Sequence, residues 1–198
     1  MTKRIHGLPS WAGLGAKAGA TRLLLDVTGN GGGTEWVSEV IALMSDKSMS
    51  RLAAREVDAV CDRSGLWRGQ PPACSVFGAE EERDTIQGSG EWTGPVLVLA
   101  NRNTASAAED LVAWLQQNRV ARVIGERTLG AGCGYANGGT RTQLRASHFD
   151  VMMSNCARYL ENGVNEIEGI APDIAIDMHI EDPAAQAQAL AAALGKNA

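Results

Sequence analysis

The chain has 198 residues, of which 44% are hydrophobic and 21% charged, and its formal net charge is -5 at pH 7. This length suffices for one domain with a sizeable core, and the composition is typical of a globular protein. The negative charge argues against a nucleic-acid or anionic-membrane surface. We therefore expect no nucleic-acid partner. No stretch approaches the roughly eighteen apolar residues of a transmembrane helix, so we also expect no membrane span.

The first part of the chain predicts a tail followed by a strand, a glycine turn and a helix. Residues 1–19 are rich in Gly and Ala without a clear period, and we expect them to form a tail or a partial helix. They lack the long apolar region of a signal peptide. Residues 22–27 are predicted to form the first buried strand. Asn30-Gly-Gly-Gly33 turns into a helix capped by Thr34. Four apolar residues share one face of that helix: Val37, Val40, Ile41 and Met44.

Residues 45–94 form a polar and largely irregular excursion. Residues 51–60 are compatible with a helix, and the remainder is expected to be loop. Trp67 and Trp92 lie in these loops, where a tryptophan either lines a cleft or pins the loop to the body of the domain; we favour pinning. The acidic run Glu80-Glu-Glu82 is expected to be a solvated face.

The four cysteines leave two interpretations open. Cys61 and Cys74 bracket a polar loop rich in Gly and Pro, which a disulfide would stabilise by roughly 3 kcal/mol. Cys133 and Cys156 are expected on neighbouring strands, and no spacing fits a CxxC or zinc motif. We favour a Cys61–Cys74 disulfide in an exported parent protein over four unpaired thiols in a cytosolic one; the compartment itself stays unknown.

The centre of the chain predicts a strand, a sharp turn with a hydroxyl, and a helix. Residues 95–100 are a continuous apolar run typical of a buried parallel strand. Ser106 follows at the start of a helix, where free N–H groups and the helix dipole stabilise developing negative charge. Acyl-transfer enzymes place a nucleophile and an oxyanion hole in such a position. The alternative is that Ser106-Ala-Ala-Glu109 is only a capping box.

The last part of the chain completes an α/β pattern. Residues 120–124 predict another strand, and residues 140–153 predict a hairpin around the turn 145–147, with His148 as a structural or surface residue. A strand at 174–176 and an Ala-rich helix from Asp182-Pro183 to Gly195, which should dock on the sheet, close the domain. We therefore predict an α/β domain with a mixed sheet, with the tail at 1–19 and the core at 20–198.

Four motifs in a fixed order resemble the S41 serine peptidases, which include the C-terminal processing (tail-specific) proteases and the tricorn core. They are Leu23–Gly33, Thr104–Glu109, Gly125–Gly130 and Gly169–Ile174. The resemblance implies the spiral α/β sandwich of the S41, ClpP- and crotonase-like type. It also implies that Ser106 is the nucleophile and that the N–H of Ala107, with that of Gly31 or Gly32, forms the oxyanion hole. Without the resemblance, the glycines predict only a tight turn.

The chain departs from the family at its general base. The processing proteases pair their Ser with the Lys of a Gly-Lys-Gly segment, and here that position is Ala131, which cannot accept a proton. Tricorn-like members use an upstream His and a Glu near the Gly-x-x-Pro-Asp segment, so Glu166 and Glu168 are candidates for that Glu, or are a solvent-facing acidic pair. The only upstream histidine is His6. We expect a C-terminal piece of a larger S41-like protein that lacks its general base.

The resemblance implies a serine endopeptidase that acts on polypeptides without a cofactor or metal ion. The base would come from a missing N-terminal segment or from another copy in a homo-oligomer. Two alternatives are a non-catalytic binding or scaffold module, which the loss of the Lys favours, and a crotonase-like acyl-CoA enzyme, which no motif supports. Fold alone does not decide between them.

Overall fold

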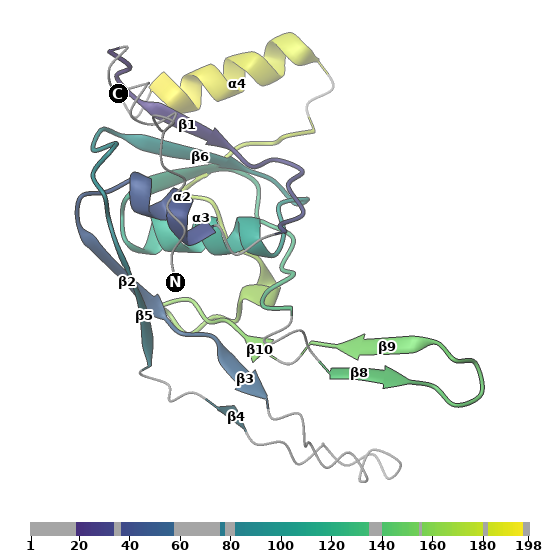
Figure 1. The fold of residues 1–198 in the computed structure, drawn as a ribbon. Helices are drawn as coiled ribbons and strands as arrows, with labels where there is room; N and C mark the ends of the chain where they lie inside the picture. Colours follow the sequence, from purple (N-terminus) through teal and green to yellow (C-terminus); the bar gives the residue numbers. More distant parts are fainter. Residues whose placement is uncertain are drawn as a thin grey trace.

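The computed structural model describes residues 19–33, 37–57, 76–77, 82–134, 140–154, 156–179 and 182–195. Within them, a central parallel sheet is covered by helices on both faces, and a group of short antiparallel strands lies to one side (Figure 1). The α/β architecture predicted from the sequence is confirmed. None of the described helices is both long and apolar enough to cross a bilayer.

The central sheet has the order β1-β6-β7-β11, and all its neighbouring strands run parallel. These strands are β1 (Leu23–Asp26), β6 (Val96–Ala100), β7 (Ala121–Gly125) and β11 (Ile174–Ala175). All five residues of β6 are buried, because a central parallel strand is covered on both faces and so reads as a continuous apolar run. The carboxyl ends of β1 and β6 therefore meet at one edge of the sheet, and the glycine turn and Ser106 follow them there.

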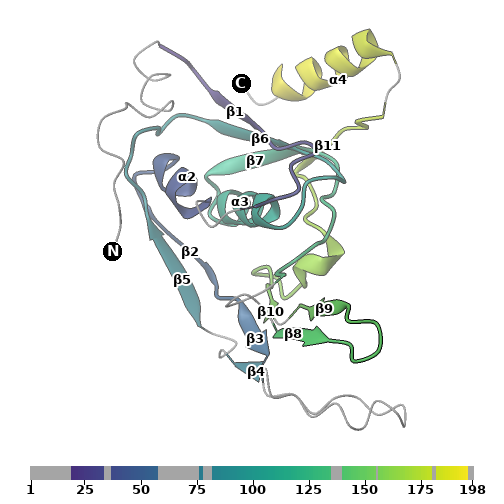
Figure 2. The same ribbon diagram turned by 45° about the vertical axis from the view of Figure 1, so that its right-hand side comes forward.

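Alternate side chains of β6 enter two separate cores. Val96, Val98 and Ala100 pack with α2 (Val37–Leu43) and α3 (Ala107–Gln117) on one face. Leu97 and Leu99 pack with α4 (Pro183–Gly195) on the other. The docking of the terminal helix on the sheet, expected from the sequence, is thus confirmed, and α4 lies across the sheet from α2 and α3 in Figures 1 and 2.

The helix proposed for residues 51–60 is wrong over the described residues 51–57. Residues 51 and 52 belong to β2 (Ser48–Leu52), which pairs antiparallel with β5 (Arg83–Gln87). Residues 55–57 form β3 (Arg55–Val57). Met49 and Arg51 point inward on alternate positions of β2 and are 1% exposed each. A tertiary partner therefore decides this segment: the buried Arg51 meets two carboxylates that no local pattern reveals.

Two more short strands and a hairpin extend from the body of the domain. In the order β10-β3-β4, β3 lies between β10 (Cys156–Ala157) and β4 (Val76–Phe77). The predicted hairpin is confirmed as β8 (Thr140–Gln143) and β9 (Asp150–Met153), which project beside β10 (Figure 2).

The structure tests some of the loop predictions and leaves others outside its described residues. Trp92 is 4% exposed in the main core, and its indole N–H donates to the Pro95 carbonyl oxygen at 3.3 Å, so the prediction that it pins the loop is confirmed. Trp67 and the proposed Cys61–Cys74 disulfide lie outside the described residues, as does most of the tail at 1–19. The division into tail and core stays a prediction.

Candidate active site

Ser106 lies at the sharp turn between the end of β6 and the start of α3. It is the N-cap of α3, with φ 55° and ψ -120°, and residues with a side chain rarely adopt a positive φ. Such a conformation persists only where neighbouring contacts hold it. Here the Ala105 N–H donates to the Asn30 carbonyl oxygen at 2.9 Å, and the Asp110 N–H donates to the Ser106 carbonyl oxygen at 3.0 Å. The turn is therefore fixed on both sides of Ser106.

The glycine loop after β1 is tied to the segment that leads to Ser106. The Thr104 hydroxyl donates to the Val27 carbonyl oxygen at 2.8 Å, and the Gly29 N–H donates to Asn101 Oδ1 at 3.0 Å. These bonds join two segments more than seventy residues apart in the sequence. The loop after β1 and the loop after β6 therefore form one unit at the carboxyl edge of the sheet.

Gly32 touches the Ser106 turn directly. It has φ 93°, and a Cβ on it would lie 2.7 Å from the Ser106 Cβ and 2.8 Å from the Ala107 nitrogen. Within the described part of the chain, the N–H groups of Gly31 and Ala107 have no hydrogen-bond acceptor, whereas the Gly32 N–H donates to Asn30 Oδ1 at 2.9 Å. Of the two glycines proposed for the oxyanion hole, Gly31 therefore has the available donor.

A cavity of 620 Å³ opens beside Ser106 between α2, α3 and β5. Ser106 and Ala107 line it together with Asp110, Cys133 and Arg158. An adjoining hollow of 200 Å³ lies between the glycine loop, α2 and α3. Its lining is mostly apolar and includes Val27, Val37, Val40 and Leu111. The turn that carries Ser106 thus borders a cavity with both polar and apolar walls and a second, mostly apolar one.

The capping interpretation of Ser106 and Glu109 is correct as far as it goes. The two residues form a capping box at the start of α3, in which the Ser106 N–H donates to Glu109 Oε2 at 2.9 Å. No hydrogen bond joins the Ser106 hydroxyl to another side chain among the described residues. Capping and an accessible hydroxyl coexist here, because the Glu109 carboxylate binds the backbone N–H of Ser106 while the Ser106 residue lines the cavity.

Glu166 lies in a buried ion-pair network next to this cavity. The residue belongs to the short helix η2 (Glu166–Glu168) and is 0% exposed. Its carboxylate pairs with Arg51 and, at 2.6 Å, with Nε of Arg158. Arg158 in turn donates to the carbonyl oxygens of Ser106 at 3.1 Å and of Gly132 at 3.0 Å. Glu166 is therefore connected to Ser106 through Arg158.

Asp110, one turn into α3, belongs to the same network. It pairs with Arg51, and its Oδ1 lies 3.8 Å from Nη1 of Arg158. Burial raises the pKa of the Asp110 carboxyl above its usual value, and the attraction of Arg158 and Arg51 opposes that rise only in part.

Glu168, the other acidic candidate, is exposed. Its carbonyl oxygen accepts from Nη1 of Arg127 at 3.3 Å, and the structure does not bring its carboxylate to Ser106. No described histidine reaches Ser106 either. His148 lies in the hairpin with φ 57°, and His179 contacts Arg102 and Glu126, each at 3.3 Å. His6 is outside the described residues, among which no cluster of His, Cys, Asp and Glu suits a metal ion.

Cys133 and Cys156 form a disulfide with a Cα–Cα distance of 5.5 Å. Their sequence context predicts neighbouring strands for the two residues but not the bond between them, and only Cys156 is in a strand. The two residues flank the hairpin at 140–153, and a hairpin brings its two flanks together. That pattern is the signal that could have identified the pair. The disulfide joins the glycine-rich segment at 130–134 to β10, two residues before Arg158.

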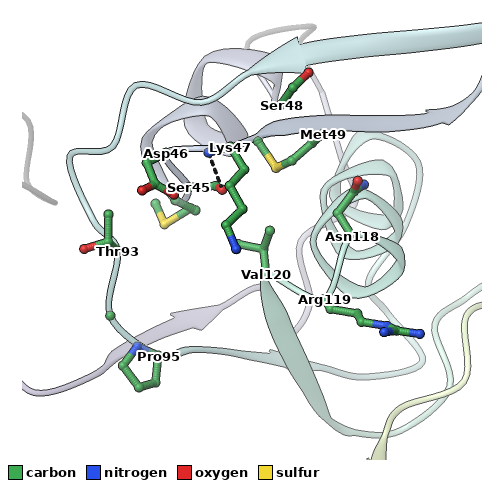
Figure 3. A pocket seen from close by; sticks show the side chains of 12 residues that line it. Ser45, Asp46, Lys47, Ser48, Met49, Thr93, Pro95, Asn118, Arg119 and Val120 are labelled. Carbon is green, nitrogen blue, oxygen red and sulfur yellow. Dashed lines mark hydrogen bonds between the residues drawn. The ribbon is translucent and has the colours of Figure 1, made fainter.

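A third hollow, of 410 Å³, lies at the opposite end of α3 (Figure 3). Its wall includes Asn118 and Arg119, which follow the helix, whereas Ser106 precedes it. An eleven-residue helix is roughly 16 Å long. The hydrogen bond drawn there joins the Lys47 N–H to the Ser45 hydroxyl at 3.0 Å. This hollow is therefore remote from the candidate nucleophile.

The known proteins that this chain resembles in sequence are peptidases. The model of peptidase family S41 matches residues 11–176. The chloroplastic C-terminal processing peptidase of Tetradesmus obliquus is 27% identical over 171 residues, which are 83% of this chain and 31% of that protein. The chloroplastic carboxyl-terminal-processing peptidase 3 of Arabidopsis thaliana is 32% identical over 91 residues, which are 45% and 16% of the two chains. The chain thus spans less than a third of either relative.

Solved structures share the fold at lower identity. The photosystem II D1 C-terminal processing protease has a TM-score of 0.57 at 22% identity and covers 83% of this chain and 37% of its own. Mature CPAF complexed with lactacystin has a TM-score of 0.65 at 16% identity and covers 99% and 48%. The arrangement of sheet and helices is therefore that of S41 proteases.

Proposed function

Because this chain belongs to peptidase family S41, we propose that it is a serine endopeptidase-type domain in which Ser106 is the nucleophile. The observation that carries the proposal is the conformation of Ser106. Ser106 combines a positive φ at the start of α3 with a hydroxyl on the wall of a cavity. Beside it lie the N–H groups of Ala107 and Gly31, which have no acceptor among the described residues. A residue that served only as a cap would not need a strained backbone, since ordinary N-caps have φ and ψ in the β region.

The reaction that this arrangement supports is attack of the Ser106 hydroxyl oxygen on a peptide carbonyl. The carbonyl oxygen gains negative charge as the tetrahedral intermediate forms. The N–H groups of Ala107 and Gly31 would donate to it, and the N-terminal dipole of α3 would stabilise it further. The proposed substrate is a polypeptide, the apolar hollow next to Ala107 suits an apolar side chain of it, and no cofactor or metal takes part.

The general base is the part of the mechanism for which the described residues offer no ordinary candidate. Ala131 stands at the Lys position and cannot accept a proton. Glu166 is neutralised by Arg51 and Arg158, so we assign it to orienting Arg158 rather than to proton transfer, and Glu168 has no supporting contact with Ser106. Because loss of the base from a triad costs several orders of magnitude in rate, we expect hydrolysis only when a base comes from outside the described residues, from an additional segment or a second copy.

The second candidate is a binding module that keeps the S41 fold without turnover. Ala131 favours it, because the residue that would activate Ser106 in a Ser–Lys dyad is absent. Such a module would bind a peptide in the same cavity, so substrate binding does not discriminate between the two functions. Chemical reactivity of Ser106 does.

The deciding experiment is labelling with a serine-directed fluorophosphonate. Wild-type protein should incorporate the probe at Ser106, identified by peptide mass mapping, and Ser106→Ala should not incorporate it. The substitution should lower the free energy of unfolding by about 1 kcal/mol through loss of the cap. Fluoride leaves a phosphonate far more readily than an amine leaves a peptide, so labelling should proceed slowly at high pH without the base that hydrolysis needs. Wild type that never labels, at any pH from 6 to 10, would therefore favour the binding module.

A further inference from the structure

Glu109 is a buried carboxylate with more partners than a helix cap requires. It is 0% exposed, and its two oxygens accept four hydrogen bonds. Oε2 accepts from the N–H of Ser106 and of Ala131, both at 2.9 Å. Oε1 accepts from the Thr128 hydroxyl at 2.5 Å and from the Gly130 N–H at 2.7 Å. Only the bond from Ser106 belongs to the capping box.

All four partners of this carboxylate are donors. An ionised carboxylate only accepts, and its two oxygens offer about four lone-pair positions. The four donors therefore match the ionised form of Glu109, and hydrogen bonds to an ion are stronger than those between neutral groups. A neutral amide of the same shape would turn an NH₂ group towards two of these donors.

The bonds connect two segments that a peptidase site must keep in register. One is the turn of Ser106, and the other is the segment at 128–131, whose last residue is at the position of the family's Lys. The second segment is itself fixed: the Thr128 hydroxyl accepts from the Ile170 N–H at 2.8 Å. A Cβ on Gly130, which has φ 83°, would lie 2.3 Å from the Ile167 carbonyl oxygen. Glu109 thus links the Ser106 turn to a segment that cannot shift freely.

We propose that Glu109 is the positioning residue of this site: its ionised carboxylate holds Ser106 in the positive-φ conformation and sets its distance from the segment at 128–131. The catalytic significance of this inference rests on the proposed role of Ser106 as the nucleophile. The positioning itself concerns only the backbone of the turn and does not depend on that role. Glu109 does not touch the reacting atoms, because it binds the N–H of Ser106 and not its hydroxyl.

A simple cap and a positioning residue differ in their tolerance of glutamine. The capping box accepts Gln as well as Glu at this position, so a Glu109 that only caps would be replaced by Gln without consequence. A Glu109 that holds four donors as an anion would not. Glu109→Gln is therefore the discriminating variant. Asp173→Asn is its matched control, because Asp173 also accepts a backbone N–H, that of Val123 at 2.7 Å, and that N–H belongs to β7.

Two measurements on folded wild type, Glu109→Gln and Asp173→Asn test the proposal. The first is the second-order rate of Ser106 labelling by a fluorophosphonate, which should fall at least tenfold in Glu109→Gln and stay unchanged in Asp173→Asn. The second is amide hydrogen exchange by NMR. Exchange at Ser106, Gly130 and Ala131 should become at least tenfold faster in Glu109→Gln, while the amides at 111–117 of α3 keep their wild-type protection.

The outcomes separate this proposal from the proposed function. Wild type that does not label, together with faster exchange at the three amides in Glu109→Gln, rejects the peptidase role and retains the positioning. Wild-type labelling and wild-type exchange in Glu109→Gln overturn the positioning role and leave a cap only. If Glu109→Gln does not fold, Glu109→Asp takes its place, because it keeps the charge but shortens the reach. Its labelling should then be reduced, and wild-type labelling by that variant overturns the proposal.

Discussion

Replacement of Gly32 by Ala tests most directly whether the glycine loop shapes the nucleophile turn. The added methyl group would lie 2.7 Å from the Ser106 Cβ and 2.8 Å from both the Ala105 carbonyl oxygen and the Ala107 nitrogen. Two of these three atoms are backbone of the turn itself. The turn must therefore move, or the loop must move away from it.

The expected loss of stability has two components. At φ 93° an L-residue carries a conformational penalty of roughly 1–2 kcal/mol. Forcing a methyl group into a closely packed contact costs about 1–3 kcal/mol. Together they lower the free energy of unfolding by about 2–5 kcal/mol. That is a large part of the roughly 5–15 kcal/mol typical of a folded domain.

Two neighbouring glycines provide controls that separate these components. Gly31 has no atom within 4 Å of an added Cβ and no positive φ, so Gly31→Ala should change stability by less than about 0.5 kcal/mol. Gly29 has φ 69° and equally open surroundings, so Gly29→Ala should lose only the conformational penalty of about 1–2 kcal/mol. Urea unfolding of the three variants measures the series, and fluorophosphonate labelling of each reports on Ser106.

The expected order of stability is Gly31→Ala, then Gly29→Ala, then Gly32→Ala as the least stable, with loss of Ser106 labelling in the last variant alone. If Gly32→Ala is as stable as Gly29→Ala and labels normally, the loop does not press on the turn. The glycine loop and the Ser106 turn would then not form one unit.

Two further predictions concern the base and the cysteines. Ala131→Lys should restore a proton acceptor at the family's position and raise the rate of peptide hydrolysis at least tenfold. This rate should increase with pH, because an unperturbed Lys has a pKa of about 10.4. Hydrolysis that persists when Ser106→Ala is added to this variant would refute the Ser–Lys interpretation. Non-reducing peptide mapping should find Cys133 linked to Cys156, and also Cys61 linked to Cys74. Reduction of the first bond, which spans 23 residues in sequence, should lower stability by about 3 kcal/mol on the chain-entropy model, and an unchanged melting temperature after reduction would contradict this.

Patterns within single segments were enough to predict the central elements of the fold. The apolar run at 95–100 indicated a strand covered on both faces, and β6 is buried throughout. The hairpin at 140–153 and the helix from Pro183 followed from alternation and from a cap with proline. These predictions succeeded because their physical causes are local: periodicity, turn residues and helix ends act within a few residues of one another.

The ordered motifs also indicated the family and a turn with a hydroxyl at Ser106. They could not reveal the conformation of that residue. Its positive φ depends on Asn30, on Gly32 and on the carboxylate of Glu109, which contact the turn from different segments. The Ser-x-x-Glu pattern indicated one of the four hydrogen bonds of Glu109 and concealed the other three, whose donors lie 19 to 22 residues further along the chain.

Only the tertiary structure decided the strand at Arg51, the position of Glu166 and the pairing of Cys133 with Cys156. A local pattern allowed a helix at 51–60, but Arg51 is buried where Glu166, 115 residues away, neutralises it. A buried charge requires a partner, and the partner's position is a property of the whole fold. For the same reason Glu166, predicted as a catalytic candidate, lies in an ion-pair network behind Ser106. Sequence alone determined the strands of the central sheet, the β8–β9 hairpin and the helices α2, α3 and α4. The packing of distant segments decided the strands at 48–57 and which side chains meet at the site.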